Sequence, residues 1–404
     1  MQHYDWGDPD AIPALTAKSN PQKQPWAEMW MGAHPDLPSE IEFDGQWIPL
    51  NQVIAKYPQQ VLGKRVAQVF HQTLPFLFKV LAAAQPLSIQ VHPSKTSAES
   101  GFQKENEMGI PLNAFHRNYK DTNHKPEIIA ALTPFFGLRG FRPLQEIKVL
   151  LNSIPECHFI LDDLREGEMN SVQKVYEKLI RLSDVEVHRR LEPIIQRLLE
   201  KNSNQAFTKD TPEYWILRSN QCYSQNGMHD RGLFSFFLLN LVKLLPGQAM
   251  YLTAGILHAY LEGVGIELMA NSNNVLRGGL TTKHVDVDEL LKNLTFREGK
   301  IDILCPEPKS NESSFQVFNT SSTEFELQKF SSNDASVEIN QCANGPEILL
   351  PTSLEIHETN KIVTESCQLD LRQGYPILIC HGVNYSLKLA PEAQVFRAVV
   401  PQVL

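Results

Sequence analysis

The amino-acid sequence predicts a mainly β fold that is interrupted by a helical insertion. Short apolar segments with alternating polar residues occupy residues 74–91 and return after Arg231, as expected for strands. Between them, residues 143–226 are rich in charged side chains and carry apolar residues at helical spacing. Short apolar runs separated by polar turns then continue over 310–404. We therefore expect a β domain, an α-helical domain inserted into it and a second, C-terminal β domain.

The length of the chain agrees with this division. Its 404 residues, 42% of them apolar, are enough for more than one buried core. We place the first β domain at residues 1–142 plus 230–309, the helical insertion at 143–229 and the C-terminal β domain at 310–404.

Individual elements follow from the local patterns. The first strands are expected within 74–91, and after the insertion strands are expected at 234–245, at 250–252 and in the run up to residue 269. Two helices of the insertion are marked by apolar positions at Val172, Val175, Tyr176 and Leu179, and at Leu191, Ile194, Ile195, Leu198 and Leu199. The C-terminal strands are expected at 323–330, 336–339 and 375–380.

One short segment is repeated in the two β domains. Residues 244–247 resemble residues 371–374, and each copy ends in glycine and precedes an apolar strand. Tyr385 lies as far after Gly374 as His258 lies after Gly247. The two β domains are therefore either related barrels or alike by chance at this point.

The charge and the termini limit the class of protein. The net charge of −9 argues against binding to nucleic acid or to an anionic membrane. The first residues lack the pattern of a signal peptide, and no apolar run of about 18 residues occurs, so a cytoplasmic protein is expected. The six cysteines include no CxxC pair, which argues against a disulfide scaffold and a thiolate zinc site. We expect a monomer.

Four residues form a candidate metal site. Strand alternation places Ser88, Gln90 and His92 on one face, Glu127 opens an apolar strand, and His258 follows a glycine-bearing turn. Taken singly, each piece has a simpler interpretation: a hydrogen-bonded surface pair, a solvated strand end and a core histidine.

Together these pieces resemble the two halves of a cupin barrel motif, His-x-His with a downstream Glu and then Gly-x-x-His, with Gln90 at the first histidine position. Two imidazoles, one carboxylate and one amide oxygen suit Zn²⁺, and also Mn²⁺, Fe²⁺ or Co²⁺. The first β domain is then a cupin-like (jelly-roll) catalytic barrel, and the C-terminal one a degenerate cupin-like domain.

Longer motifs carry a closer resemblance. They are Tyr4-Asp5-Trp6-Gly7, the tryptophan-containing segment 25–35, and Met-Ala-Asn-Ser-Asn-Asn-Val-Leu-Arg-Gly-Gly-Leu-Thr at 269–281. With these motifs the chain resembles the type I phosphomannose isomerases (mannose-6-phosphate isomerases), from its start to about Phe296. The resemblance implies an enzyme with one zinc ion per chain that interconverts D-mannose 6-phosphate and D-fructose 6-phosphate by proton transfer through an enediol(ate).

The resemblance also implies roles for single residues. The zinc ligands are expected to be Gln90, His92, Glu127 and His258, and Arg277 is expected to be the catalytic arginine. The pocket is expected to be lined by Ser88, Lys125, Glu267 and Lys283.

Two departures from the family pattern are visible. Asn273 stands where the family usually has an Asp that helps to open the sugar ring, so that this role is either dispensable or met by another group. The family also normally has several residues before Tyr4, so we expect a shortened edge strand.

The reaction needs a general base, and three residues are candidates. A proton must move between C1 and C2 while a cation stabilises the enediolate. Strand alternation favours Lys125 over His124, because Lys125 then shares a face with Glu127. Glu267 is an isolated acid in an apolar strand, so its pKa should rise. The alternative for Glu267 is a structural ion pair.

The phosphate needs fixed donors, for which Arg277, Lys125, Lys283 and Ser88 are candidates. An ion pair across a loop is the alternative for Arg277. Lys79 lies in an apolar strand and should meet either a carboxylate or the pocket. The remaining substrate-binding candidates are Trp6, Glu28 and Asn273, with core packing as the alternative for Trp6.

Two other functions fit a metal cupin. An iron-dependent oxygenase would use the same fold, although Gln90 and the motif around Arg277 argue against it. A non-catalytic sugar-binding cupin is the other alternative, and Asn273 is the residue that favours it.

Overall fold

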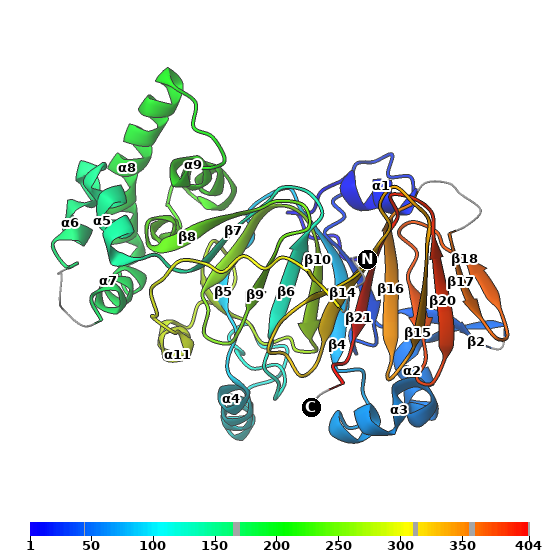
Figure 1. The fold of residues 1–404 in the computed structure, drawn as a ribbon. Coiled ribbons are helices and arrows are strands. Elements are labelled where there is room, and N and C mark those ends of the chain that lie inside the picture. The colour runs from blue at the N-terminus through cyan, green and yellow to red at the C-terminus, as the bar shows by residue number, and fades with distance from the viewer. Residues whose placement is uncertain (44, 165–169, 310–313, 355–359, 403–404) are drawn as a thin grey trace.

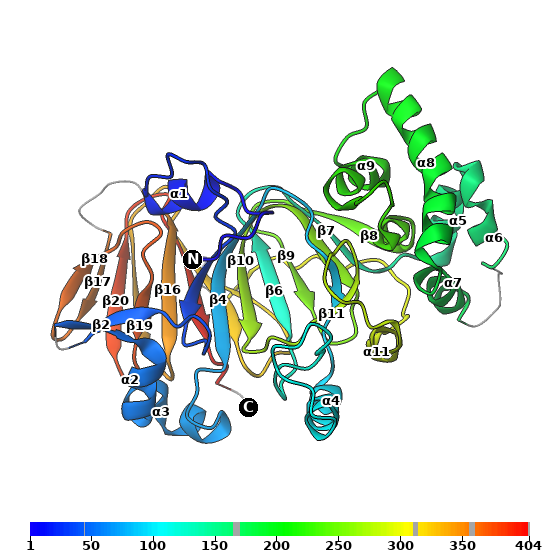
Figure 2. The ribbon, with the colours of Figure 1, turned by 180° about the vertical axis from the view of Figure 1, so that it is seen from behind.

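The computed structural model describes residues 1–43, 45–164, 170–309, 314–354 and 360–402. Figure 1 shows a helical part at one end, a central barrel, and a second set of strands at the other end. The view from behind shows the same order, with helices α2 and α3 beside the second set of strands (Figure 2). The predicted mainly β fold with a helical insertion is thus confirmed. The exact domain boundaries stay a prediction.

The central barrel is built on the long strand β10, which hydrogen-bonds to β4, β5, β6 and β7. Further strands extend both sides, with β1 on β4, β11 on β5, β8 on β7 and β9 on β6. The strands of this barrel are β1 (Glu28–Gly32), β4 (Phe76–Ala83), β5 (Ile89–Val91), β6 (Glu127–Ala131), β7 (Phe135–Phe141), β8 (Leu239–Leu244), β9 (Ala249–Leu252), β10 (His258–Ala270) and β11 (Leu276–Gly279).

Strand alternation decides which side chains of β4 face the barrel interior. Phe76 and Phe78 belong to the core that lies between the two β domains. Leu77 and Lys79, on the opposite face, line a cavity inside the barrel. In β10 the same alternation places Ile266 in the core with Phe76 and Phe78, and Glu267 on the cavity wall. An apolar strand can therefore carry charged residues on its inner face.

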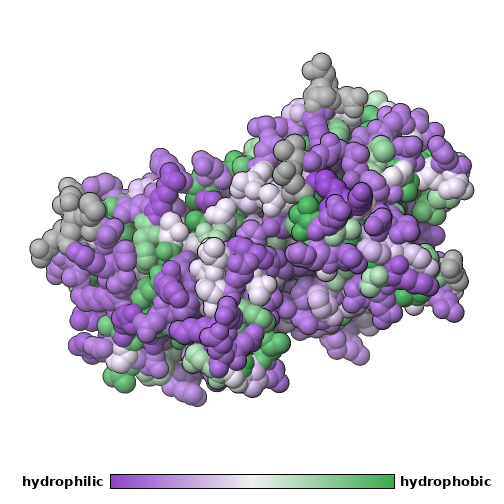
Figure 3. Space-filling view, turned by 90° about the horizontal axis from the view of Figure 1, so that it is seen from below, coloured by the Kyte–Doolittle hydropathy of each residue, from purple (hydrophilic) through white to green (hydrophobic). Residues whose placement is uncertain are grey.

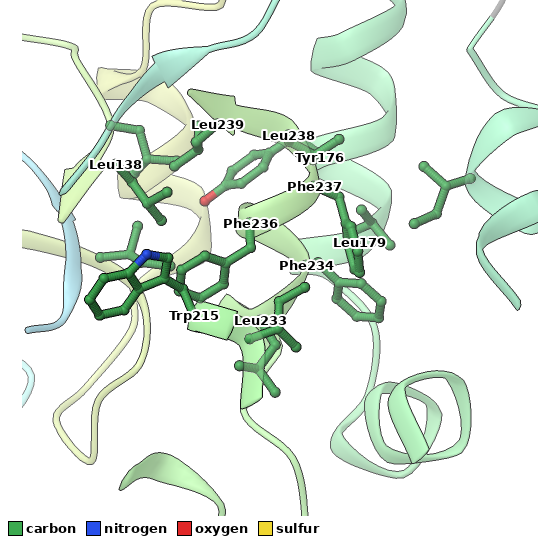
Figure 4. Close-up of a cluster of buried hydrophobic side chains, with 14 of the residues drawn as sticks. Leu138, Tyr176, Leu179, Trp215, Leu233, Phe234, Phe236, Phe237, Leu238 and Leu239 are labelled. Atoms are coloured by element: carbon green, nitrogen blue, oxygen red, sulfur yellow. The ribbon is translucent and has the colours of Figure 1, made fainter. Parts of the chain in front are cut away.

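The helical insertion shares its core with the central barrel. Figure 4 shows Trp215 and Phe236 packed together beside Leu138 of β7, and all three belong to one buried cluster that also includes Ile89 of β5. The elements of the insertion are α5 (Leu144–Asn152), η1 (Pro155–Cys157), α6 (His158–Leu161), α7 (Ser171–Ile180), α8 (Asp184–Asn204) and α9 (Pro212–Tyr223). The longest, α8, begins at a capping box in which Ser183 and Glu186 satisfy each other's backbone N–H groups. The insertion is thus fixed to the strands that carry the candidate metal ligands.

One detail of the prediction is wrong. Residues 234–238, predicted as part of a strand, lie in η2 (Arg231–Phe234) and α10 (Ser235–Leu238), and the strand begins only at Leu239. The Asp230 side chain starts this helical stretch by accepting from the Gly232 N–H, and a short apolar run does not distinguish a buried helix from a strand. Leu199 lies in α8 as predicted, but its side chain is 45% exposed and lies outside the buried face of that helix.

The C-terminal domain consists of two packed sheets. Their orders are β12-β13-β14-β21-β16-β19 and β15-β20-β17-β18. The strands are β12 (Glu307–Pro308), β13 (Phe315–Phe318), β14 (Glu326–Ser331), β15 (Val337–Cys342), β16 (Glu347–Ser353), β17 (Lys361–Thr364), β18 (Gln368–Asp370), β19 (Ile377–Ile379), β20 (Asn384–Leu389) and β21 (Gln394–Val399). Its first sheet packs on the central barrel through Phe318, Leu327 and Phe396, which share one core with Phe78.

The repeated segment occupies equivalent places in the two β domains. Gly247 and Gly374 both have positive φ and precede strands β9 and β19. Tyr385 lies in β20, as His258 lies in β10, but the Tyr385 hydroxyl donates to Glu347 at 2.7 Å. The structure therefore favours a relation between the two β domains over a chance likeness of the two segments. In the C-terminal domain, Tyr385 and Glu347 satisfy each other.

The remaining elements lie at the edges of the barrels. They are α1 (Ala11–Thr16), the hairpin β2 (Glu40–Phe43) and β3 (Gln46–Pro49), α2 (Leu50–Lys56), α3 (Pro58–Val69), α4 (Lys95–Glu107) and α11 (Val287–Asn293). Gln2 pairs with Glu28 only in a single isolated bridge. No helix in the described part has both the length and the hydropathy needed to cross a membrane. Seen from below, the surface is mostly hydrophilic with scattered apolar groups (Figure 3).

Candidate active site

Two histidines and a glutamate meet in the interior of the central barrel. Glu127 Oε2 lies 3.4 Å from His92 Nε2 and 3.6 Å from His258 Nε2, and all three side chains are buried. His92 Nε2 and Glu127 Oε2 have no hydrogen-bond partner. Buried polar atoms without partners are costly, so a group that binds them is expected at this point. The donor set, two imidazoles and one carboxylate, fits a divalent metal ion such as zinc.

Hydrogen bonds to the backbone fix both imidazole rings. His92 Nδ1 donates to the Asn274 carbonyl at 2.8 Å, and His258 Nδ1 donates to the Ile256 carbonyl at 2.8 Å. Each Nε2 therefore keeps a free lone pair for a metal. Burial lowers the pKa of His92 to about 4, so its ring is neutral at pH 7.

Gln90 comes to the same place from β5. Gln90 and His258 are direct cross-strand partners, and the Gln90 amide lies 3.3 Å from His258 Nε2. A half turn of the amide about its last bond presents its carbonyl oxygen instead of its nitrogen. The four predicted ligands thus gather around one point.

Glu127 also connects the metal site to a lysine. Its Oε1 lies 3.1 Å from Lys125 Nζ, while its Oε2 faces the two histidines. Burial alone would raise the pKa of Glu127, but the Lys125 charge and the contacts with His92 and His258 together outweigh that effect, and the pKa lies well below its usual range. The carboxylate is therefore ionised, as a metal ligand must be.

A second buried ion pair lies on β4 and β10. Lys79 and Glu267 are direct cross-strand partners, with Lys79 Nζ 2.8 Å from Glu267 Oε2 and 3.8 Å from Glu28 Oε1. Trp30 donates to Glu28 at 2.6 Å. Both alternatives for Lys79 therefore hold, since it meets carboxylates and also lines the cavity. Burial raises the pKa of Glu267 although Lys79 opposes the effect.

The opposite wall of the cavity carries cations without carboxylate partners. Among the described residues, no carboxylate lies within ion-pair distance of Arg277 or Lys283. Burial lowers the pKa of Arg277, and burial together with Arg277 and Lys120 lowers the pKa of Lys283. An ion pair across a loop is thus not seen for Arg277. Arg277 is partly buried, so its unpaired charge is costly unless an anion binds it, whereas Lys283 is exposed to solvent at the cavity wall.

These groups surround one cavity of about 740 Å³, which is large enough for a sugar phosphate. It brings together most of the predicted site residues, namely Trp6, Glu28, Lys79, Ser88, Gln90, Lys125, Glu127, Glu267, Asn273, Arg277 and Lys283. Arg277 is the cross-strand neighbour of Gln90, so its side chain lies on the same face as the metal site.

Comparisons with known proteins agree with this site. Residues 1–144 match the family model described as phosphomannose isomerase type I, catalytic domain. The mannose-6-phosphate isomerase of Salmonella typhimurium is 42% identical over 357 residues, which cover 86% of this chain and 88% of the relative. The chain belongs to the type I phosphomannose isomerase family.

Relatives and solved structures of this family extend over almost the whole chain. The human mannose-6-phosphate isomerase is 31% identical, covering 98% of this chain and 96% of the relative. A crystal structure of the Salmonella typhimurium isomerase bound to fructose 6-phosphate and zinc has a TM-score of 0.80, at 34% identity, and covers 99% of this chain and 97% of that one. The resemblance predicted from the motifs is confirmed.

The departure from the phosphomannose isomerase pattern at Asn273 has a neighbour that supplies a carboxylate. Asn273 Nδ2 donates to Asp36 Oδ2 at 2.9 Å, and the Asn273 N–H donates to Asp121 Oδ2 at 2.7 Å. Asn273 itself lines the cavity. The carboxylates of Asp36 and Asp121 thus lie beside Asn273, although neither is part of the cavity wall.

His34 and Tyr260 are among the cavity residues that the sequence does not predict. His34 lines the cavity, and its Nδ1 accepts from the Asp36 N–H at 3.2 Å. A lone histidine gave no signal for this place. The Tyr260 hydroxyl is buried without a partner, and burial raises its pKa. Tyr260 follows His258 by two residues in one strand, so alternation already predicts that the two side chains share a face.

Among the predicted site residues, His124 is the one that lies neither on the cavity wall nor in the group formed by His92, Glu127 and His258. Its Nε2 lies 2.6 Å from Glu324 Oε1, and it is absent from the cavity wall. Burial alone would raise the pKa of Glu324, but the hydrogen bond and charge of His124 lower it to about 2. His124 thus joins the catalytic barrel to the C-terminal domain, one residue before Lys125.

This contact predicts a pH-dependent stability. Because the folded pKa of Glu324 is depressed, its contribution is present above about pH 4.5 and is lost as the pH falls toward 2. We expect Glu324→Gln to lower the unfolding midpoint at pH 6, with a difference from the wild type that shrinks toward pH 3. Glu326→Gln, which neutralises a more exposed partner of Lys309, is the control in thermal unfolding. A difference that stays constant over this range contradicts the prediction.

Proposed function

We propose that this chain is a zinc-dependent aldose–ketose isomerase that interconverts D-mannose 6-phosphate and D-fructose 6-phosphate. The observation that carries the proposal is the pair of buried, unpartnered atoms, His92 Nε2 and Glu127 Oε2, which lie by a cavity whose other wall holds unpaired cations. The relatives named mannose-6-phosphate isomerase and the related structure with fructose 6-phosphate and zinc support the same substrate and metal.

In this proposal, Gln90, His92, Glu127 and His258 hold the zinc ion. The bound ion supplies a Lewis acid that stabilises negative charge on substrate oxygens. The ionised Glu127 balances part of the metal charge, and Lys125 orients its carboxylate.

Arg277 and Lys283 then have different roles. Arg277 neighbours Gln90 across the strand pair, so its guanidinium stabilises the charge that develops on the enediolate. Lys283 lies beyond the end of β11 and is one of the two unpaired cations, which favours a role in binding the phosphate.

Lys125 and Glu267 are the groups that we propose for proton transfer between C1 and C2. Lys125 contacts the carboxylate of the metal site, and Glu267 has a raised pKa, which is typical of groups that exchange protons near neutral pH. His124 is left out because it lies against Glu324. Incorporation of solvent deuterium at C2 of the sugar tells which of Lys125 and Glu267 is the base. The variant that lacks the base loses this incorporation as well as turnover.

The cellular setting is part of the same proposal. We infer a cytoplasmic, monomeric enzyme of mannose metabolism whose partner is a small sugar phosphate. The six free cysteines support a reducing compartment, and the net charge of −9 supports a small ligand over nucleic acid or membrane.

A coupled assay tests the function. Purified protein is expected to produce fructose 6-phosphate from mannose 6-phosphate, to lose this activity with a chelator and to regain it with added zinc. The Asn273→Asp variant in the same assay shows whether Asp36 already supplies the missing carboxylate, in which case it brings no gain. Zinc-loaded protein without turnover overturns the proposal, and oxygen uptake with Fe²⁺ would favour a cupin oxygenase instead.

A further inference from the structure

The helical insertion contains a second group of side chains whose ligand atoms lie close enough together to hold a metal ion. His188 and Glu192 are one helical turn apart on α8, and His229 comes from the segment between α9 and η2. Residues at positions i and i+4 of a helix share a face. One ligand atom from each of the three residues lies within 4.8 Å of the others.

The His229 ring is held as metal-binding histidines usually are. Its Nδ1 donates to Asn220 Oδ1 at 2.7 Å, and Ser224 Oγ donates to the same amide oxygen at 2.5 Å. A histidine that donates one N–H to a fixed oxygen presents its other nitrogen to the metal. That nitrogen, Nε2, lies 2.7 Å from Glu192 Oε2, a hydrogen-bond distance that must open before a metal ion can bind both atoms.

His188 completes the group. Its ring lies 5.0 Å from the His229 ring, at 30° to it, and its Nδ1 is buried without any hydrogen-bond partner. The Glu192 side chain is 42% exposed, which leaves a path for an ion from solvent. The hydrogen bond from Gln196 to the other Glu192 oxygen and the His229 contact lower the pKa of Glu192, so the carboxylate is charged.

We propose that His188, Glu192 and His229 form a second divalent-metal site, distinct from the catalytic one. Two imidazoles and one carboxylate select Zn²⁺ or a similar transition-metal ion over Ca²⁺ or Mg²⁺, which prefer oxygen ligands. Ligand atoms in a tetrahedral zinc site are about 3.4 Å apart, so the His229–Glu192 contact opens by less than about 1 Å when the ion enters. Water fills the fourth position.

The site would fix one wall of the catalytic cavity. His229 directly precedes Asp230, whose Oδ1 accepts from the N–H groups of Gly232 and Leu280, each at 2.7 Å. Leu280 and Thr281 line the cavity. An ion that ties α8 to residue 229 therefore restrains the segment that supports this wall. The role is structural, since none of the three ligands lines the cavity or belongs to the group formed by His92, Glu127 and His258.

Zinc content measured on the full chain tests the proposal. In a zinc titration monitored by calorimetry, we expect the wild type to bind about one more ion per chain than Glu192→Gln or His229→Gln. The matched control is His158→Gln, which removes an exposed histidine of the same insertion and should leave the zinc content unchanged. Circular dichroism verifies folding, and Glu192→Gln alters only a half-exposed side chain, so one cluster variant remains interpretable in any case.

A second arm separates a metal site from a simple ion pair. Asn220→Ala removes the oxygen that orients His229, and zinc affinity at the second site should fall by about 10- to 100-fold without being abolished. Hydrogen exchange at residues 280–281 should slow when the second ion binds. Equal zinc numbers in the wild type, Glu192→Gln and His229→Gln overturn the proposal, because His229 and Glu192 then form an ion pair only.

Discussion

Replacing Glu127 by glutamine is expected to lower kcat/KM for mannose 6-phosphate by about 10³-fold or more and to deplete the catalytic site of zinc. Glu127 is the only carboxylate among the four ligands, and its two oxygens face different partners. Glutamine keeps the shape of the side chain but removes the charge that balances the ion. It also leaves the Lys125 ammonium without a counter-charge in a buried place.

The measurement combines metal analysis with the coupled assay. Glu347→Gln is the matched control, because Glu347 is also a buried glutamate in a barrel, where it accepts from Tyr385 and Arg397. It should lower the unfolding midpoint while zinc content and kcat/KM stay at the wild-type level. A Glu127→Gln protein that binds zinc and turns over normally would remove Glu127 from the ligand set.

The sequence was informative about this site because strand alternation is a short-range property. The period of two that links Ser88, Gln90 and His92 does not depend on the rest of the fold. The turn at Gly255, which places His258 at the start of a strand, is likewise a local feature of the sequence. The meeting of these pieces at one point depends on pairings such as Gln90 with His258, which are 168 residues apart. The family motifs indicated that these distant residues meet, because strand alternation by itself does not predict which strands pair.

Other features needed the three-dimensional structure. Lys79 and Glu267 each looked like an unpaired charge in an apolar strand, and only the register of β4 with β10 makes them partners. The position of His124 depends on Glu324, which lies in the other β domain. The strand prediction fails over 234–238 because Asp230, a polar residue before an apolar run, starts a helix here as readily as it could end a turn.

Arg277 and Lys283 are expected to separate catalysis from phosphate binding. Arg277→Ala should lower kcat by about 10²- to 10³-fold, as for the loss of one donor to a developing negative charge, while inhibition by inorganic phosphate changes little. Lys283→Met should instead raise KM and weaken phosphate inhibition by about 10-fold, with a smaller change in kcat. The difference follows from the pairing of Arg277 with Gln90 and from the place of Lys283 after the end of β11.

Each of these two variants is the control for the other, since both remove an unpaired cation from the same cavity. Arg139→Lys adds a control outside the cavity, because Arg139 is partly buried and donates to the Tyr251 carbonyl. An Arg277→Ala enzyme with normal kcat but without inhibition by phosphate would contradict this assignment. It would indicate that the phosphate binds at Arg277, next to the metal site. In that case the reacting carbons would lie toward Lys79 and Glu267, and Glu267 would become the stronger candidate for the base.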